Sequence, residues 1–264
     1  MMTMTPQTPQ TAQVLENNCI AAGIWRMTVH APGIGHIAAG QFAHVAVEEY
    51  LLRRPISVCD WDAASSTMTL IYQVVGGGTD AMTGWQTGKA VDMLAPQGNG
   101  FAPEGQGDVA LVGGGVGVAP LYLAARQLIQ AGRTVHSFLG FRDAAHTYLL
   151  DELAALGPVA YATEDGSGGT QGYVTSILQQ ALRDWHPAAI WTCGPRPMLK
   201  ALTSLPEVQS IPTQASLEER MGCGMGGCLV CNCGIREGGD VRYRRVCKDG
   251  PVFALSDVVW EGGI

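Results

Sequence analysis

The order of apolar and polar positions divides the chain into two regions. From residue 14 to about residue 102, short apolar or alternating runs are separated by turn residues such as Pro32-Gly33. Runs of this kind indicate strands, because successive side chains of a strand point to opposite faces. The predicted strands cover residues 23–29, 42–47, 57–61, 68–75 and 90–95. Regular short strands without a helical pattern predict a closed antiparallel β-barrel.

A different pattern begins near residue 105. Short apolar runs predict strands at residues 108–112, 134–140, 159–163 and 190–193. Apolar positions three and four residues apart predict helices at residues 120–130, 149–156, 174–182 and 198–205. Alternating strands and helices are typical of a parallel α/β sheet.

We therefore expect a multidomain fold with an all-β part and an α/β part. The predicted domains are an N-terminal barrel at residues 1–104, a nucleotide-binding α/β domain at residues 105–210 and a small C-terminal domain at residues 211–264. Residues 1–13 are rich in Thr, Gln and Pro, so the sequence predicts a flexible tail there.

Four cysteines near the C-terminus have the spacing of an iron–sulfur site. The motif is C-x4-C-x2-C followed by a fourth cysteine after fifteen residues, formed by Cys223, Cys228, Cys231 and Cys247. This is the plant-type ferredoxin spacing for a [2Fe–2S] cluster, and the glycines between the cysteines let backbone N–H groups approach sulfur. A zinc site and disulfides are the alternatives. Cys233 is an additional thiol that could replace a ligand or simply be buried.

A glycine-rich loop lies between the strand at 108–112 and the helix at 120–130. Backbone N–H groups and the helix dipole can meet a pyrophosphate there, and glycine permits close approach. A second loop follows the strand at 190–193, at the same edge of the sheet. The candidate NAD-binding residues are Gly113, Gly114, Gly115, Gly117 and Pro120 in the first loop and Cys193, Gly194 and Pro195 in the second. A tight turn and a buried cysteine are the alternative interpretations.

The predicted barrel carries a candidate flavin site. Arg54 can pair with a phosphate through two hydrogen bonds, and Ser57 offers a hydroxyl to a flavin ring nitrogen. A flavin is also expected on chemical grounds, because a hydride brings two electrons and an iron–sulfur cluster accepts one. Taken alone, Arg54 followed by Pro55 is weak evidence, because such a pair usually means an exposed arginine and a proline at a sheet edge.

Composition narrows the classes of function. The chain has 264 residues, is 47% hydrophobic and carries a formal net charge of −7, which argues against a nucleic-acid partner. No apolar run reaches the roughly 18 residues needed to span a membrane. Because the N-terminal stretch lacks the apolar core of a secretory signal, we expect a cytoplasmic protein with reduced thiols.

The barrel, nucleotide domain and cysteine motif follow one another in the order of the ferredoxin–NADP reductase superfamily. Within it, the chain resembles the electron-transfer subunits of dihydroorotate dehydrogenase B over nearly its whole length. The segments that carry the resemblance are 54–57, 98–101, 113–120, 193–195, 223–231 and 246–253. The last is the most discriminating, since generic reductases of the superfamily lack such a C-terminal segment.

The resemblance implies FAD, a [2Fe–2S] cluster and NAD(H) as the redox groups. It implies that FAD contacts Arg54, Pro55, Ile56, Ser57, Ile71, Tyr72, Gln73, Gly78 and Thr79, and that the cluster is held by Cys223, Cys228, Cys231 and Cys247. The implied activity is that of an oxidoreductase subunit that passes electrons from NADH to the FMN of a separate catalytic subunit. That partner oxidises dihydroorotate in pyrimidine synthesis, and the two chains form a heterotetramer with two copies of each.

Several alternatives stay open. Similar chains serve sulfhydrogenases and NADH-dependent ferredoxin:NADP oxidoreductases, and a redox-sensing or assembly module without enzymatic activity is a third possibility. Arg142 and Asp143 follow a predicted strand and leave NAD and NADP undecided, although the resemblance favours NAD. A basic set, Arg242, Arg244, Arg245 and Lys248, would stabilise the cluster, meet an acidic partner or form a solvated strand face.

Overall fold

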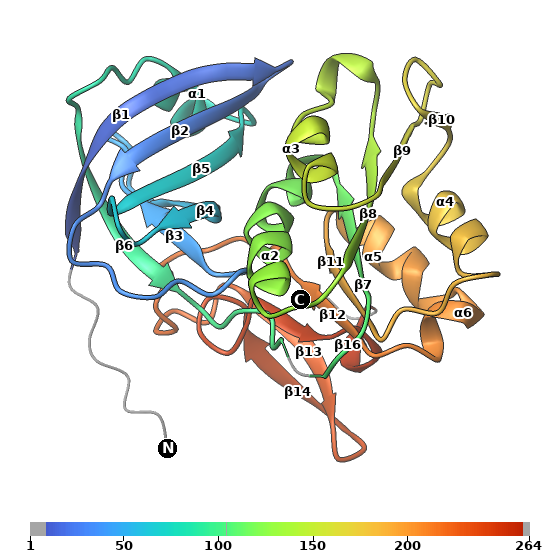
Figure 1. Cartoon of the computed structure of the whole chain (residues 1–264). Helices are drawn as coiled ribbons and strands as arrows, with labels where there is room; N and C mark the ends of the chain where they lie inside the picture. The colour runs from blue at the N-terminus through green and yellow to red at the C-terminus, as the bar shows by residue number, and fades with distance from the viewer. Residues whose placement is uncertain (1–8, 104, 261–264) are drawn as a thin grey trace.

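A computed structural model describes residues 9–103 and 105–260 of the chain (Figure 1). Residues 1–8 of the tail predicted at residues 1–13 lie outside the described residues. Its last part was predicted wrongly, because Gln10–Gln13 pair with a barrel strand. The predicted boundary residue 104 and residues 261–264 of the predicted C-terminal domain also lie outside the described residues.

Six antiparallel strands close into the predicted barrel, drawn in blue to green in Figure 1. They are β1 (Gln10–Ala21), β2 (Ile24–His30), β3 (Phe42–Val45), β4 (Arg54–Asp62), β5 (Thr67–Gln73) and β6 (Ala90–Gln97). Their order is β1-β2-β5-β4-β3-β6, and β6 pairs with β1 to close the barrel. Met27, Val58 and Leu70 are fully buried in it.

A short helix, α1 (Gly77–Thr83), follows β5, where the sequence predicted turn residues and no helix. The glycines at its start have poor helix propensity. The hydroxyl of Thr79 compensates, because it accepts the backbone N–H groups of Val75 and Gly76 and donates to the Gly76 carbonyl. The first turn of a helix has backbone N–H groups without a partner, and a side chain that accepts hydrogen bonds there stabilises the helix. The Thr79 hydroxyl therefore favours a helix at this position.

The second sheet has the order β10-β9-β8-β7-β11-β12-β15. Its strands are β7 (Val109–Gly114), β8 (Val135–Phe141), β9 (Val159–Thr163), β10 (Thr170–Gln171), β11 (Ala189–Cys193), β12 (Thr213–Ser216) and β15 (Val252–Ala254). Six of these strands are parallel and β15 runs antiparallel to β12, so the predicted parallel α/β sheet is confirmed.

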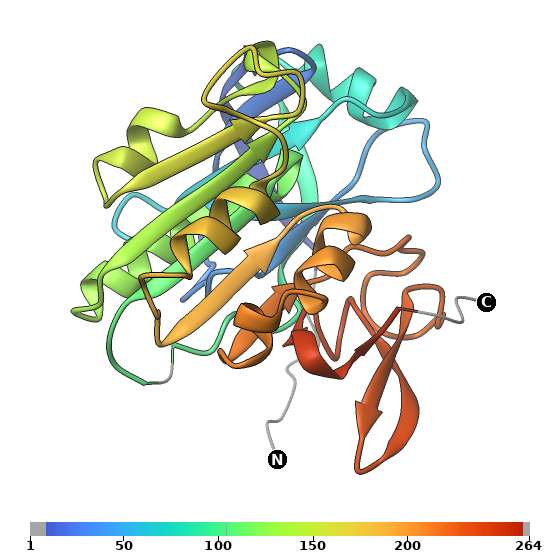
Figure 2. The same ribbon diagram turned by 90° about the vertical axis from the view of Figure 1, so that its right-hand side faces the viewer.

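Helices cover both faces of this sheet (Figures 1 and 2). They are α2 (Ala119–Gln130), α3 (Leu150–Ala154), α4 (Val174–Ala181), α5 (Arg196–Thr203) and α6 (Pro206–Gln209). Leu111 on β7 shares a core with α2 and the barrel, whereas its neighbour Val112 shares a core with α4, α5 and the C-terminal segment. Successive side chains of β7 point to opposite faces of the sheet, so this one strand contributes to both hydrophobic cores.

A small antiparallel sheet near the C-terminus has the order β14-β13-β16. Its strands are β13 (Asn232–Glu237), β14 (Asp240–Arg245) and β16 (Val258–Val259), and β13 and β14 project from the body of the molecule in Figure 2. Strands β12 and β15 lie beyond the domain boundary predicted at residue 210, yet they belong to the large sheet. Among the described residues, no helix is long and apolar enough to cross a membrane.

Gln127 on α2 ties the barrel to the sheet. Its side-chain oxygen accepts the backbone N–H of Ala39 at 2.9 Å, and its amide nitrogen donates to the carbonyl of Ile37 at 2.7 Å. We expect Gln127→Ala to lower the free energy of unfolding by about 1–3 kcal/mol, because two buried backbone groups lose their partner. Urea unfolding measures this, with Gln130→Ala at the exposed end of the same helix as the matched control. Equal midpoints for the two variants would contradict the prediction.

Candidate functional site

A cavity of about 500 Å³ lies between the barrel and the large sheet. Eight of the nine residues predicted to contact FAD line it, namely Arg54, Pro55, Ile56, Ser57, Ile71, Tyr72, Gln73 and Thr79. They come from β4, β5 and α1. The opposite wall is formed by Val116, residues 216–221 and Pro251, so the cavity is bounded by all three parts of the chain. We call it the barrel cavity.

Gly78, the ninth predicted FAD residue, does not line the barrel cavity but makes room for Arg54. A Cβ atom on Gly78 would lie 2.1 Å from the guanidinium Nε of Arg54, which is far too close for any real contact. The guanidinium also lies over the ring of Tyr50, 5.0 Å from its centroid, and donates to the Leu52 carbonyl. Packing and hydrogen bonding therefore hold the position of the only predicted phosphate-pairing arginine.

A second cavity, of about 530 Å³, lies beyond the carboxyl ends of the parallel strands. We call it the strand-end cavity. Of the eight predicted NAD-binding residues, Gly114, Gly115 and Pro195 line it. The others lie elsewhere: Gly113 and Pro120 are packed in the core, Cys193 is buried, Gly194 borders a third cavity, and Gly117 contacts the neighbouring loop.

The close contact at Gly117 explains one glycine of the loop. A Cβ atom there would lie 2.4 Å from the backbone carbonyl oxygen of Cys193, so no larger residue fits without moving one of the two loops.

Burial raises the pKa of the Cys193 thiol well above its ordinary value, which leaves it protonated and apolar in character.

Sequence reasoning missed most of the strand-end cavity. Gly140 and Phe141 end β8 and Glu164 follows β9; these residues and Tyr173 line the cavity and were missed, whereas Arg142, which also lines it, was among the sequence candidates. Their positions after consecutive parallel strands were the available signal, because the carboxyl ends of such strands meet at one edge.

Asp143, which the sequence offered as an alternative to Arg142 at a ribose, has its own partners. Its carboxylate contacts Arg142 Nε at 3.0 Å and His146 Nδ1 at 2.6 Å. These hydrogen bonds, the one from His146 first, lower the pKa of Asp143. Asp143 is not among the residues that line the strand-end cavity, whereas Glu164 is.

The four predicted metal ligands lie in two pairs. Cys223 and Cys228 are joined reciprocally: the N–H of Cys223 donates to the Cys228 sulfur at 3.3 Å, and the N–H of Cys228 donates to the Cys223 sulfur at 3.4 Å. The N–H of Cys247 donates to the sulfur of Cys231 at 3.4 Å. In residues 9–103 and 105–260, no three Cys, His, Asp or Glu side chains converge on one point that could hold a single metal ion.

Backbone donors surround the first of these sulfurs. The N–H groups of Gly227 and Met225 donate to the Cys223 sulfur at 3.2 and 3.5 Å, in addition to that of Cys228. Burial by itself would raise the pKa of Cys223, but these donors outweigh burial and lower the pKa to about 7. The loop is therefore organised to stabilise a thiolate, which is the form that binds metal.

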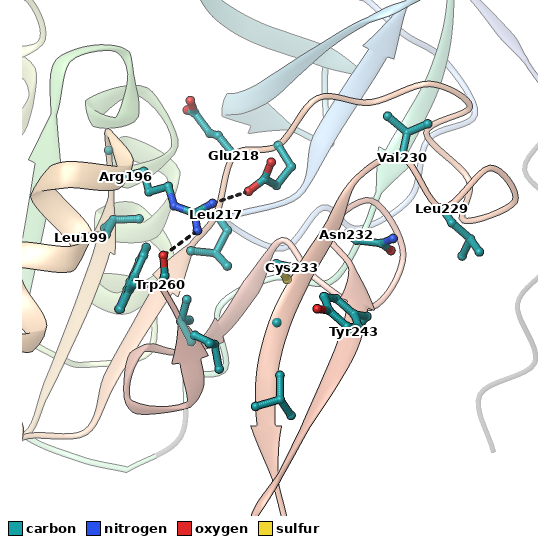
Figure 3. A pocket seen from close by; sticks show the side chains of 16 residues that line it. Arg196, Leu199, Leu217, Glu218, Leu229, Val230, Asn232, Cys233, Tyr243 and Trp260 are labelled. Atoms are coloured by element: carbon teal, nitrogen blue, oxygen red, sulfur yellow. Dashed lines mark hydrogen bonds and ion pairs between the residues drawn. The ribbon is translucent and has the colours of Figure 1, made fainter. Parts of the chain in front are cut away.

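Cys233 belongs to a different environment, a cavity of about 360 Å³ between α5 and the small sheet (Figure 3). Its sulfur donates to the carbonyl of Arg244 at 3.5 Å, and burial raises its pKa to about 12. Figure 3 shows Arg196 crossing this cavity, where it binds Glu219 and the carbonyl of Trp260. The structure thus favours the interpretation of Cys233 as a buried thiol.

Glu218 is a further residue that the sequence did not reveal. It lines both the barrel cavity and the cavity of Figure 3. Its side chain is open to solvent along these cavities, yet the surrounding protein removes enough water to raise the pKa of its carboxyl. No local pattern marks this position, because the segments that line these cavities with Glu218 are distant in sequence.

The predicted basic set is largely neutralised within the chain. Arg244 and Arg242 pair with Glu237, and Arg245 pairs with Asp249 at 2.8 Å. Arg245 also donates to the carbonyl of Gly226 at 3.1 Å, so it fixes the cysteine loop from the side of β14. These contacts favour a structural role over recognition of an acidic partner.

Comparisons with known proteins agree with this architecture. The family model for the iron–sulfur cluster binding domain of dihydroorotate dehydrogenase B matches residues 218–259, and that for the oxidoreductase NAD-binding domain matches residues 111–204. The electron transfer subunit of dihydroorotate dehydrogenase B (NAD(+)) from Shouchella clausii is 40% identical over 254 residues, which cover 93% of this chain and 96% of that protein. This chain belongs to the family of dihydroorotate dehydrogenase B electron transfer subunits.

Other members and solved structures extend the comparison. The electron transfer subunit from Bacillus caldolyticus is 44% identical over 83% of this chain and 86% of its own length. A chain in the structure of an NADH-dependent reduced ferredoxin-NADP oxidoreductase has a TM-score of 0.87 and 28% identity, and the match covers 98% of this chain and 92% of that one. As a member of its family, the chain is an oxidoreductase subunit that transfers electrons and contains NAD-binding and iron–sulfur-binding domains.

The contact between the two strand-end loops can be tested at Gly117. We expect Gly117→Ala to lower the free energy of unfolding by about 1–3 kcal/mol, because the added methyl group overlaps backbone atoms that have little room to move. Thermal unfolding measures the loss. Gly35→Ala is the matched control, since a Cβ atom at Gly35 meets nothing within 4 Å. An unchanged melting temperature in Gly117→Ala would refute the close approach.

Proposed function

We propose that this electron transfer subunit carries electrons between NAD(H) and the FMN of a dihydroorotate dehydrogenase catalytic subunit, by way of FAD and one [2Fe–2S] cluster. One observation carries the proposal: the barrel cavity, lined by the residues expected to contact FAD, is closed on its far side by residues 216–221, which lead directly into the cysteine loop. A flavin bound there supplies the conversion of a hydride into single electrons.

The barrel cavity suits FAD. We infer that Arg54 pairs with a phosphate oxygen, since it lines the cavity and its planar guanidinium is held in place over the ring of Tyr50. Ser57 would orient the flavin ring through its hydroxyl. The buried phenol of Tyr72, whose oxygen donates to Asn17 at 3.1 Å, would form a rigid wall beside it.

The pairing of the cysteines supports a cluster with two iron atoms. A single zinc ion would require all four sulfurs around one point, whereas the structure groups Cys223 with Cys228 and Cys231 with Cys247. A [2Fe–2S] cluster with four cysteine ligands suits two such pairs, one on each iron. The N–H donors around the Cys223 sulfur would stabilise its negative charge in the loaded loop.

The strand-end cavity suits the dinucleotide. We infer that Gly114, Gly115 and Pro195 lie beside the phosphates and the nicotinamide end of the dinucleotide. We also infer that Glu164 accepts hydrogen bonds from the adenosine ribose. An acidic side chain at the ribose favours NAD over NADP. Arg142 lines the same cavity, but its guanidinium contacts the carboxylate of Asp143 at 3.0 Å, so the proposed preference for NAD rests on Glu164.

A partner subunit would dock beside the cysteine loop. Met225, Leu229 and Val230 in the loop and Val241 and Tyr243 on β14 are each more than half exposed. Large apolar side chains gathered on a surface commonly mark a protein interface. By resemblance to the family we propose two copies of each chain in a heterotetramer and a cytoplasmic location, which suits cysteines that form no disulfide.

A different electron acceptor is the second candidate. The similarity to a chain of an NADH-dependent reduced ferredoxin-NADP oxidoreductase extends over 98% of this chain. The same cavities and the same cysteine loop would serve that role. The higher identity to dihydroorotate dehydrogenase B subunits favours the FMN partner.

The flavin site can be tested through Gly78. We expect Gly78→Ala to displace the Arg54 guanidinium and weaken FAD retention about tenfold or more, since a charge-assisted contact to phosphate is lost. Flavin content after gel filtration measures this. Gly76→Ala is the control, because a Cβ atom at Gly76 meets nothing within 4 Å. Equal flavin content in both variants would show that Arg54 does not hold the cofactor.

The route of electrons can be tested at Cys228. The chain is purified anaerobically with its partner, and NADH-linked reduction of orotate is compared with NADH-linked reduction of a dye. We expect Cys228→Ser to abolish orotate reduction and to spare dye reduction, because the dye can take electrons from the flavin. Cys19→Ser, at an exposed cysteine of the barrel, should change neither rate. A preparation that lacks an FMN-containing chain and leaves orotate untouched would favour the second candidate.

A further inference from the structure

His44 on β3 is a buried polar side chain whose function the family assignment does not explain. Its exposed fraction is 0%, and neither ring nitrogen makes a hydrogen bond of normal geometry within the part of the chain that the structure describes, although the backbone of Arg53 lies near the ring. Buried polar side-chain atoms nearly always have such a partner, because their removal from water is otherwise uncompensated. An imidazole with two unpaired nitrogens therefore points to a group that binds beside it.

The ring of His44 faces the cysteine loop. A Cβ atom on Gly224 would lie 2.1 Å from His44 Nδ1 and 2.5 Å from Cε1, so the imidazole occupies the space beside a residue that immediately follows Cys223. Gly224 has a φ of +70°, a conformation that favours glycine. The loop thus passes as closely to the barrel as a residue without a side chain permits.

The same residue lies next to the barrel cavity. In the pairing of β3 with β4, His44 is opposite Pro55 and Phe42 is opposite Ser57. Alternation along the strands places these four residues on one face, and Phe42, Pro55 and Ser57 line the barrel cavity. The Phe42 and His44 rings are 6.4 Å apart at an interplanar angle of 80°. His44 therefore lies between the proposed flavin site and the cysteine loop.

From this juxtaposition we propose that His44 is a positioning residue for the iron–sulfur centre: one of its ring N–H groups donates a hydrogen bond to a sulfur of the loaded loop. The bond fixes the centre against the barrel and raises its reduction potential, since hydrogen bonds to sulfur stabilise the more negative, reduced form. The inference rests on the proposed function only in requiring that the cysteine loop hold an iron–sulfur centre.

Two substitutions separate the hydrogen bond from the packing. His44→Leu fills much of the space without a donor, and His44→Gln keeps an N–H group. Both are purified with the partner subunit, and the potential of the centre is measured by redox titration followed by electron paramagnetic resonance. We expect His44→Leu to lower the equilibrium constant for reduction about tenfold, or about 59 mV for one electron, and His44→Gln to restore most of it. His136→Leu is the control, because His136 stacks on Trp185 away from the loop.

A potential that is unchanged in a His44→Leu preparation with full iron and sulfide content would overturn the inference. So would a shift in the flavin potential alone, which would place the partner of His44 in the barrel cavity. Iron and sulfide analysis of the unaltered protein keeps the two proposals distinct. A protein without iron and sulfide would contradict the cluster itself, whereas a loaded protein indifferent to His44 would contradict only the hydrogen bond.

A second measurement does not depend on a stable His44→Leu variant. The unaltered protein is labelled with ¹⁵N-histidine, and pulsed paramagnetic resonance of the reduced centre is searched for a histidine nitrogen coupling. We expect one coupling, which disappears in labelled His44→Gln. The lack of any histidine coupling in a loaded, unaltered sample would refute the hydrogen bond.

Discussion

The positions of all the candidate sites depend on one short segment, residues 249–254, where the three parts of the fold are joined. The backbone N–H of Asn99, at the end of the barrel, donates to the carbonyl of Gly250 at 2.6 Å. The side-chain amide of Asn99 donates to the carbonyl of Val252 and accepts its backbone N–H. Leu217 donates to Pro251 at 2.9 Å, and β15 then pairs with β12 in the large sheet. Because this segment follows Cys247 directly, the cysteine loop is fixed relative to both cavities. Groups bound at these sites would keep a constant separation without any further device.

The charge distribution around the cysteine loop follows the same logic. An anionic centre in a chain of net charge −7 needs local stabilisation, and exposed lysines or arginines would give it only weakly. The nearby arginines are instead paired with Glu237 and Asp249, and the sulfur of Cys223 is surrounded by backbone N–H groups. Backbone dipoles of this kind are already oriented and lose little freedom when a charge develops. The same backbone hydrogen bonds that suit the loop electrostatically to its ligand also restrain its conformation.

The sequence predicted well what neighbouring residues decide. The barrel strands, the alternating α/β elements and the spacing of the four cysteines are local patterns, and the fold agrees with them. It predicted poorly what distant segments decide. Strand β15 has three residues and forms only because β12 offers an edge, and α1 depends on a hydroxyl contact that overrides glycine propensity. Glu218 and His44 become notable only when segments far apart in sequence lie beside them. The family resemblance supplied FAD residues that periodicity alone could not, and the cavity later grouped eight of them.

The glycine loop lies between two cavities and borders both of them. Gly115 lines the strand-end cavity, and the next residue, Val116, lines the barrel cavity. The hydroxyl of Tyr148 donates to the carbonyls of both residues, at 3.0 and 3.1 Å, and so holds the turn between the cavities. Gly115 has a φ of +54° and Gly117 lies against the Cys193 carbonyl, so the turn is as thin as a backbone can be. A hydride donor and its acceptor must approach closely to react, so a wall one turn thick would suit the proposed binding of a dinucleotide in one cavity and a flavin in the other.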